Sequence, residues 1–274
     1  MSAVDTRSLS SVALDAAAEQ GRAALVGYLP VGYPDVAGSV DAVKAMVDGG
    51  VDVVELGLPY SDPLMDGPII QHAVDAALRA GTRTRDVLAV VEKIADTGVP
   101  VLVMTYWNPV DRYGTERFAA ALAAAGGAGL ITPDLIPDEA ADWLAASEAH
   151  GLERVFLVAP SSGPERLAAT AAACRGWVYA ASTMGVTGIR ASVGSAARDL
   201  VERTRAAGAA RVCVGLGVST REQAAEVAGY SDGVIVGTAF VRALSEAADP
   251  ASGRRAVANL AESLSVGVRE GRDR

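Results

Sequence analysis

Lysine and histidine are scarce in this chain. Among its 274 residues only Lys44, Lys93, His72 and His150 are of these two types, and all four fall in segments with helical spacing. A lysine that forms a Schiff base, or histidines that hold a metal ion, would have to come from this small set. We therefore expect neither a Schiff-base lysine nor a metal centre, and we predict no cofactor.

Cysteine is equally rare. Cys174 and Cys213 each lie beside or within an apolar segment and show no pairing pattern, which is typical of reduced thiols in the core of a cytosolic protein. The N-terminus lacks an apolar signal core, and no apolar run is long enough to span a bilayer. We therefore expect a cytoplasmic protein that does not enter a membrane.

Positive charge is also limited. The chain has 24 Lys and Arg against 33 Asp and Glu, a net charge of −9. Because no block of basic residues interrupts this composition, nucleic acid and anionic membranes are not expected partners. A phosphorylated small molecule could still bind locally, through backbone N–H groups and helix N-termini.

Short β-rich runs recur at even spacing along the chain. There are eight, at 24–30, 51–59, 99–107, 127–134, 154–160, 177–183, 211–217 and 232–237. Each is apolar on both faces, as in parallel strands covered by helices, and amphipathic stretches lie between them. The pattern predicts a single (β/α)8 TIM barrel, an α/β fold, over residues 1–274, with an extra N-terminal helix at 8–20 that closes its bottom. A doubly wound sheet is the alternative, but no GxGxxG follows the first run.

Glycines gather at the ends of the last three predicted strands. Gly188 follows the sixth strand, Gly217 the seventh, and Gly237 with Thr238 the eighth. Each glycine alone could merely shape a turn, whereas three at adjacent strand ends favour a small phosphorylated substrate. The segment 184–197 is rich in Gly and Ser and is a candidate lid.

Three carboxylates lie in the segment ELGLPYSDPLMDGP, residues 55–68. Glu55 falls inside the second apolar run, where an acid is unfavourable unless it has a partner or a function. We favour a functional role for Glu55, because no arginine that could pair with it lies at a neighbouring predicted strand end. Asp62 and Asp66 follow in a loop, and either could instead be a turn residue that bonds its own backbone. Other polar residues at predicted strand ends, each a possible core residue, are Tyr106, Asn108, Asp134 and Tyr179.

Several of these motifs together resemble the tryptophan synthase alpha subunit family. They are YLPVGYPD (28–35), ELGLPYSDPLMDGP (55–68), PDLIP (133–137), YAASTMGVTG (179–188), VGLGVST (214–220) and VGTAF (236–240), in order along nearly the whole chain. The second motif is highly specific, whereas the glycine motifs would fit several phosphate-binding barrels. The resemblance implies retro-aldol cleavage of indole-3-glycerol phosphate to indole and glyceraldehyde 3-phosphate in tryptophan biosynthesis. It also implies a beta-subunit partner, in a heterotetramer of two alpha and two beta subunits.

Residue roles carry over from the resemblance motif by motif. The catalytic residues that it implies are Glu55, Asp66 and Tyr179, and the predicted substrate-binding residues are Tyr28, Tyr106, Thr187, Gly188, Gly217, Gly237 and Thr238. Two positions depart from the family pattern. Tyr28 stands where many members have Phe in the indole pocket, and Thr183-Met184 stands where several members have an arginine at the start of the lid.

The implied reaction agrees with the residues that are present. Cleaving a carbon–carbon bond needs an electron sink, which protonation of indole carbon C3 creates within the substrate itself. Glu55 would protonate C3 and then, directly or through a water, take the hydroxyl proton. Ionised Asp66 would hydrogen-bond the ring N–H and stabilise the positive charge that develops there. Pro59 and Asp62 we assign to loop shape and to the subunit interface.

Three other functions stay open at this point. A free-standing indole-glycerol-phosphate lyase would use the same residues without a partner. Another phosphate-binding barrel enzyme, such as a sugar-phosphate isomerase, would need a different acid–base set, which the 55–68 motif disfavours. A non-catalytic barrel that regulates a beta subunit is supported only by the altered lid start, and the intact Glu55, Asp66 and Tyr179 count against it.

Overall fold

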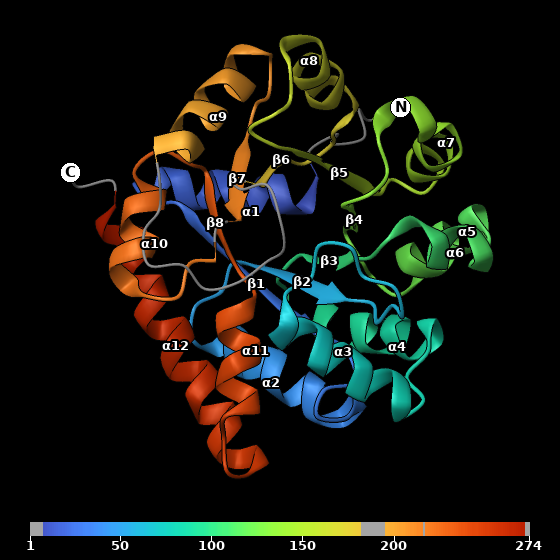
Figure 1. The fold of residues 1–274 in the computed structure, drawn as a ribbon, viewed down its shortest axis with the longest axis vertical. Coiled ribbons are helices and arrows are strands. Elements are labelled where there is room, and N and C mark those ends of the chain that lie inside the picture. The colour runs from blue at the N-terminus through green and yellow to red at the C-terminus, as the bar shows by residue number, and fades with distance from the viewer. Residues whose placement is uncertain (1–7, 182–194, 216, 272–274) are drawn as a thin grey trace.

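Eight parallel strands pair in chain order and close into a barrel (Figure 1). The computed structural model describes residues 8–181, 195–215 and 217–271. The strands are β1 (Ala24–Pro30), β2 (Val53–Gly57), β3 (Val101–Met104), β4 (Gly129–Thr132), β5 (Glu153–Val158), β6 (Val178–Ala181), β7 (Val212–Gly215) and β8 (Gly233–Val236). The predicted (β/α)8 barrel and its eight strands are confirmed. Most strands are shorter than predicted, because the apolar runs begin before strand pairing starts and continue after it has ended.

Helices surround the barrel (Figure 1). In the described part of the chain they are α1 (Leu9–Glu19), α2 (Val36–Asp48), α3 (Pro68–Arg79), α4 (Thr84–Ala95), α5 (Trp107–Tyr113), α6 (Thr115–Ala124), the 3-10 helix η1 (Pro137–Glu139), α7 (Ala141–Ala149), α8 (Pro164–Ala173), α9 (Ser195–Ala206), α10 (Arg221–Ala228), α11 (Thr238–Ser245) and α12 (Pro250–Glu270). Local sequence signals start several of them. Asp35 accepts a hydrogen bond from the Gly38 N–H at the start of α2 (2.7 Å), and Pro68 occupies the first turn of α3.

Alternate strand residues point into the barrel, and those at the bottom pack against α1. The residues of this cluster include Val26, Val53, Leu102, Ile131, Val155, Trp177, Cys213 and Ile235, together with Leu14 and Ala17 of α1. The extra N-terminal helix therefore closes the N-terminal end of the barrel, as predicted. Chemistry is then expected at the opposite end, where the strands finish.

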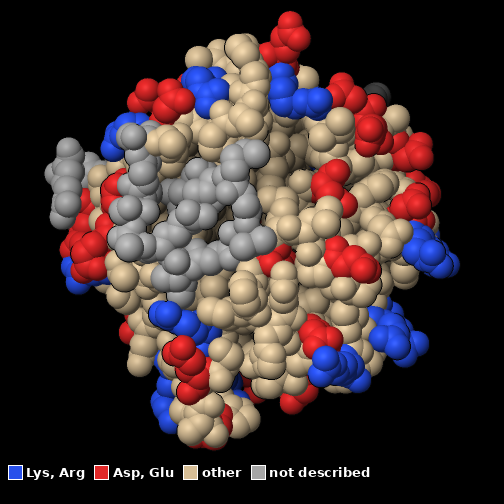
Figure 2. All heavy atoms as spheres, viewed as in Figure 1, with Lys and Arg blue, Asp and Glu red and all other residues tan. Residues whose placement is uncertain are grey.

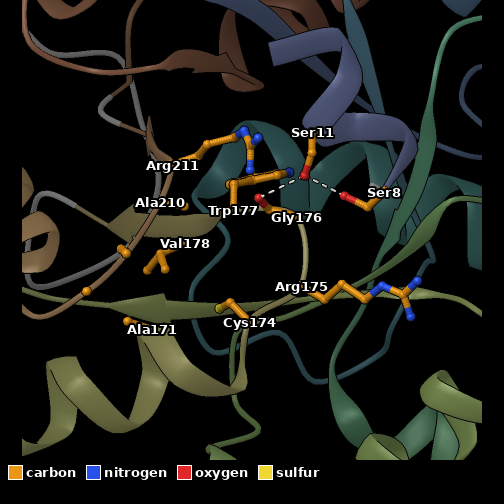
Figure 3. A pocket seen from close by; sticks show the side chains of 12 residues that line it. Ser8, Ser11, Ala171, Cys174, Arg175, Gly176, Trp177, Val178, Ala210 and Arg211 are labelled. Carbon is orange, nitrogen blue, oxygen red and sulfur yellow. Dashed lines mark hydrogen bonds between the residues drawn. The ribbon is translucent and has the colours of Figure 1, made fainter. Parts of the chain in front are cut away.

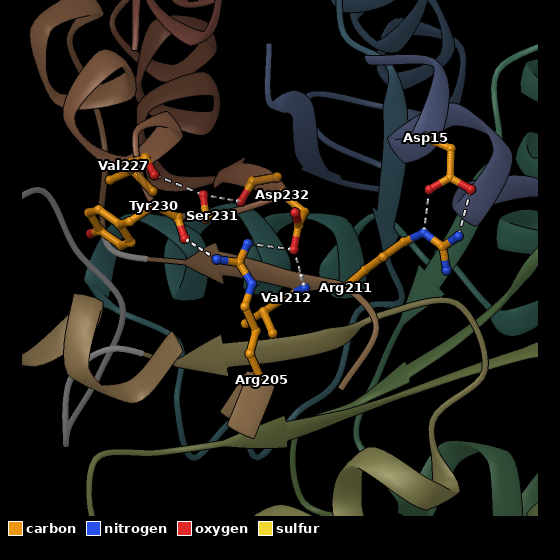
Figure 4. A network of polar contacts seen from close by, with 9 residues as sticks. Asp15, Arg205, Arg211, Val212, Val227, Tyr230, Ser231 and Asp232 are labelled. Atoms are coloured by element: carbon orange, nitrogen blue, oxygen red, sulfur yellow. Dashed lines mark hydrogen bonds and ion pairs between the residues drawn. The ribbon is translucent and has the colours of Figure 1, made fainter. Parts of the chain in front are cut away.

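Polar contacts also hold α1 in place. The Ser10 backbone N–H donates to the Glu153 carboxylate (2.8 Å), and the Ser10 hydroxyl bonds the same side chain. Arg211, just before β7, donates to both carboxylate oxygens of Asp15 (2.7 and 2.6 Å; Figure 4). These contacts fix the helix to segments that are far away in the sequence.

A pocket of about 270 Å³ lies beside α1 (Figure 3). Its lining includes Ser11, whose hydroxyl donates to the Gly176 carbonyl (3.2 Å), and Arg211, which Asp15 binds. A second lining arginine, Arg175, lies 3.8 Å from a carboxylate oxygen of Glu148. Ser11, Arg211 and Arg175 therefore already have partners within the protein.

Glu153 makes the stability of the fold depend on pH. Burial raises the pKa of this carboxyl to about 7, against the opposing hydrogen bonds from Ser10. A raised folded-state pKa means that its contribution to stability is full below about pH 4.5 and is lost as the pH rises through 7. Between pH 5 and pH 8, wild type should therefore lose about 2 kcal/mol of its free energy of unfolding through Glu153. Glu153→Gln has no proton to lose there, so its stability relative to wild type should rise by that amount.

Urea denaturation at the two pH values would measure this change. Glu92→Gln, at an exposed position on α4, is the matched control and should show no such gain. Parallel pH dependences for wild type and Glu153→Gln would contradict the prediction.

The two cysteines and the surface charges can also be compared with the predictions. Cys213 is buried, Cys174 is half-buried, and both are free thiols, as predicted. On the face shown in Figure 2, Lys and Arg side chains lie in small groups among Asp and Glu. Among the described residues, no helix combines the length and the apolar character that crossing a membrane requires.

Candidate active site

Glu55 lies on β2, in register with Tyr28 of β1 and Leu102 of β3. Its side chain is completely buried (0% exposed), and neither carboxyl oxygen has a hydrogen-bond partner among the described residues. Burial raises the pKa of this carboxyl to about 8, because loss of hydration disfavours the ionised form. At neutral pH, Glu55 therefore carries a proton that it can donate.

Asp66 lies in the loop 58–67 between β2 and α3, called here the Asp66 loop. Burial raises the pKa of its half-buried carboxyl to about 6, and a hydrogen bond with the Tyr106 hydroxyl opposes this shift. At neutral pH, Asp66 is therefore mostly ionised while Glu55 is mostly protonated. Two carboxyl groups in different charge states suit the separate jobs of acid and anion.

Tyr28 and Tyr179 lie near these two carboxyl groups. Tyr28 is almost fully buried, and Tyr179 is half-buried with its ring stacked on Trp177 (centroids 5.7 Å apart). Burial is the main cause that raises the pKa of both hydroxyls, and the charges of Glu55 and Asp66 raise them further. The structure thus gathers four predicted site residues, together with Tyr106, into one electrostatic environment.

Glycines on neighbouring strands make room for two of the phenols. A Cβ atom at Gly57 would clash with the Tyr28 hydroxyl, and a Cβ atom at Gly215 would clash with the Tyr179 hydroxyl. Neither glycine was among the predicted site residues. Gly57 could have been found, because it comes two residues after Glu55 on β2 and so points to the same side of the sheet.

Part of the predicted phosphate site falls on described residues. Gly217 follows β7 with a φ of +70°, a conformation that favours glycine. Gly237 is the N-cap of α11, and the first residue of that helix is the buried Thr238. A Cβ atom on Gly237 would lie 3.1 Å from Cδ1 of Tyr28, so this strand end borders the site.

The predicted lid falls mostly outside the described residues. Thr187, Gly188 and Thr183-Met184 all belong to that part, as does 184–194 in general. The last three residues assigned to the lid, 195–197, instead form the start of α9. The prediction was wrong there, because Ser-Ala-Ala continues directly into the helical pattern of the following residues.

Polar side chains that follow β3 and β4 hold loops together. Asp134 accepts a hydrogen bond from the Trp107 backbone N–H (2.9 Å), and the Asn108 amide donates to the Tyr60 hydroxyl (3.4 Å). Sequence reasoning flagged Asp134 and Asn108 only as polar residues at strand ends. Their partners could not be foreseen, because they depend on how neighbouring loops meet.

The scarce lysines and histidines lie on the outer helices, as predicted. Lys44 is on α2, Lys93 on α4 and His72 on α3, and His150 ends α7. In the part of the chain that the structure describes, no group of three His, Cys, Asp or Glu side chains is placed to hold a metal ion.

Comparisons with known proteins fit this geometry. The family model for the tryptophan synthase alpha chain matches residues 14–269. The chain belongs to this family. The tryptophan synthase alpha chains of Thermobifida fusca and Streptomyces coelicolor are both 60% identical to it, over 253 residues (91% of this chain, 94% of that protein) and 257 residues (93% and 95%). A structure of Mycobacterium tuberculosis tryptophan synthase matches with a TM-score of 0.91 and 58% identity, covering 96% of this chain and 99% of that one.

Family membership decides the reaction class. As a member of this family, the chain is a carbon–carbon lyase that cleaves indole-3-glycerol phosphate in tryptophan biosynthesis. The reaction that the sequence motifs implied is thereby confirmed, and the sugar-phosphate isomerase alternative is set aside. Membership also implies a beta-subunit partner.

Proposed function

We propose that Glu55 is the proton donor and acceptor of this lyase and that Asp66 is its charge partner. The observation that carries the proposal is the fully buried Glu55 carboxyl, protonated at neutral pH and clustered with an ionised Asp66. Glu55 gives its proton to indole carbon C3, which becomes part of an indolenine cation. The bond from C3 to the carbinol carbon then breaks, and its electron pair returns to the ring. The carbinol hydroxyl proton passes to Glu55, directly or through a water, and an aldehyde forms.

Asp66 has a separate role in the same protonation step. Its carboxylate accepts a hydrogen bond from the ring N–H and stabilises the positive charge that C3 protonation creates. Tyr28, Tyr106 and Tyr179 provide the surrounding walls for the indole, since Tyr28 and Tyr179 lie near both carboxyl groups and Tyr106 lies near Asp66. A fixed dipole or charge is most effective where water is excluded, as around these buried rings.

The phosphate group of the substrate is assigned to the ends of the last three strands. Gly217, Gly237 and Thr238 provide backbone N–H groups, a hydroxyl and the N-terminus of α11. Thr187 and Gly188 complete this binding site in the proposal, on the strength of the family motif. Because Gly237 borders Tyr28, a phosphate held there would leave the indole end beside Glu55.

The proposed working form is a cytoplasmic heterotetramer of two alpha and two beta subunits, in which residues 1–274 make one barrel domain. An exposed apolar side chain in the Asp66 loop supports a partner on this face: Leu64 is 77% exposed. Pro59 and Asp62 belong to the same loop, so partner contact and catalytic aspartate would be linked by a few residues of backbone.

Indole release from indole-3-glycerol phosphate, measured with and without a tryptophan synthase beta subunit, tests the proposal. We expect slow release by the isolated chain and a sharp increase on adding the partner. Fast release by the chain alone would indicate a free-standing lyase on the same scaffold. No release in either case would refute the proposed acid–base roles and leave the non-catalytic, regulatory barrel.

A further inference from the structure

The Asp66 loop is a surface loop that carries a catalytic group. It has no regular secondary structure, and its outer part is exposed, including Ser61, Asp62 and Leu64. A loop of this kind can adopt many conformations, and in most of them the Asp66 carboxylate would lie away from its catalytic position. Something must therefore hold the Asp66 side chain at the mouth of the barrel.

Two contacts fix the backbone at the ends of this loop. The Leu58 N–H donates to the Met104 carbonyl at the end of β3 (3.0 Å), and the Gln71 side-chain amide of α3 donates to the Asp66 carbonyl (2.7 Å). Both contacts involve the loop backbone. Neither determines where the Asp66 carboxylate points.

The Tyr106 hydroxyl binds the loop directly beside Asp66. Its oxygen accepts a hydrogen bond from the Met65 N–H (2.9 Å). The same hydroxyl acts on the Asp66 carboxyl by lowering its pKa, against the effect of burial. One phenol thus fixes the backbone next to Asp66 and favours the ionised carboxylate.

Tyr106 is itself rigidly placed. It follows β3 directly and is the N-cap residue of α5, and its side chain is only 6% exposed. The ring packs on Tyr60 with centroids 5.3 Å apart. On either side along the chain, the Thr105 N–H bonds the Ile131 carbonyl (3.1 Å) and the Trp107 N–H bonds Asp134. The hydroxyl therefore belongs to a residue whose backbone is fixed on both sides, just after β3.

We infer that Tyr106 is a positioning residue, whose hydroxyl holds the backbone at Met65 against the barrel and thereby places the neighbouring Asp66 carboxylate toward the substrate. This role goes beyond lining the indole pocket, and it rests on the proposed role of Asp66. The titratable groups that face the Asp66 carboxyl are Tyr28 of β1, Tyr106 after β3 and Tyr179 of β6, with Glu55 of β2 near Tyr28 and Tyr179, and Asp134 near Tyr106. Among these, the Tyr106 hydrogen bond favours the ionised form of Asp66, which burial disfavours.

Tyr106→Phe tests the inference by removing the hydroxyl and leaving the ring. We expect kcat to fall about 10- to 100-fold, the worth of a hydrogen bond to a charged group, with a smaller change in KM. The acidic limb of the pH profile of kcat/KM should move upward by roughly one unit. Amide hydrogen exchange across residues 58–67 should also become faster, because Met65 loses its acceptor.

Tyr60→Phe is the matched control, since it removes the hydroxyl of the ring that packs on Tyr106 and leaves both rings in place. It should keep the wild-type pH profile. The double variant Tyr106→Phe/Asp66→Asn should be no slower than Asp66→Asn alone, because Tyr106 acts through Asp66.

The outcomes separate this inference from the proposed function. If Asp66→Asn is slow but Tyr106→Phe keeps the wild-type kcat, acidic limb and exchange rates, the positioning role is refuted and the role of Asp66 stands. Independent, multiplicative losses in the double variant would likewise overturn it. If Asp66→Asn is as fast as wild type, the proposed role of Asp66 fails first, and the inference fails with it.

Discussion

Glu55→Gln is expected to reduce kcat by about 10²- to 10⁴-fold, the usual contribution of a general acid–base group. Glutamine has nearly the same shape as protonated Glu55 but cannot give a proton to C3. In wild type, kcat/KM should fall as the pH rises above about 8, because the buried carboxyl then loses its proton. The measurement is indole release between pH 5 and 9 for both proteins.

Binding and folding should survive this substitution. The Glu55 side chain is completely buried and its oxygens have no partner among the described residues, so an amide there breaks no hydrogen bond that the structure shows. Inorganic phosphate binding, followed by calorimetry, and the urea midpoint at pH 7 serve as controls. A variant that releases indole at the wild-type rate would exclude Glu55 as the proton donor.

Asp66→Asn is expected to lower kcat by about 10²- to 10³-fold, the loss seen when a group that stabilises transition-state charge is removed. The amide can still accept a hydrogen bond from the ring N–H, but it cannot offset the positive charge. The acidic limb of the wild-type pH profile should lie near pH 6 and should be absent from the residual activity of the variant. Single-turnover indole release would isolate this effect from product release.

Asp62→Asn is the natural comparison for this variant. It removes one negative charge from the same loop at an exposed position, so it should leave single-turnover rates of the isolated chain near wild type. Equal losses in Asp62→Asn and Asp66→Asn would show that net loop charge matters, and would contradict a specific role for Asp66.

The barrel itself was predictable because its signals are local and repeated. Each strand is a short apolar run, and eight such runs alternate with amphipathic stretches. Glu55 could be identified as a candidate functional acid at the same stage, because it interrupts an otherwise apolar run in which an unpaired carboxyl is unfavourable. What fills the space beside a side chain depends on its neighbouring strand, which explains why Gly215 beneath Tyr179 was missed.

Contacts between distant segments were beyond sequence reasoning. Tyr106 was predicted as a substrate-binding residue, but its hydrogen bond to Met65 joins residues 41 apart in the sequence. Glu153 and Ser10, 143 residues apart, gave no local signal of their pairing. The phosphate-site assignments of Gly188 and Thr187 rest on motif alone, and they stay predictions.

The docking of α1 at the bottom of the barrel has a consequence for biosynthesis of the chain. The helix leaves the ribosome before the residues that bind it, because Glu153 and Arg211 follow Ser10 and Asp15 by 143 and 196 residues. At about 5–20 residues per second, translation would separate these events by roughly 7 to 40 s. During that interval the apolar face formed by Leu14 and Ala17 has no barrel to cover, so the nascent chain needs either a chaperone or the surface of its own early strands to shield it.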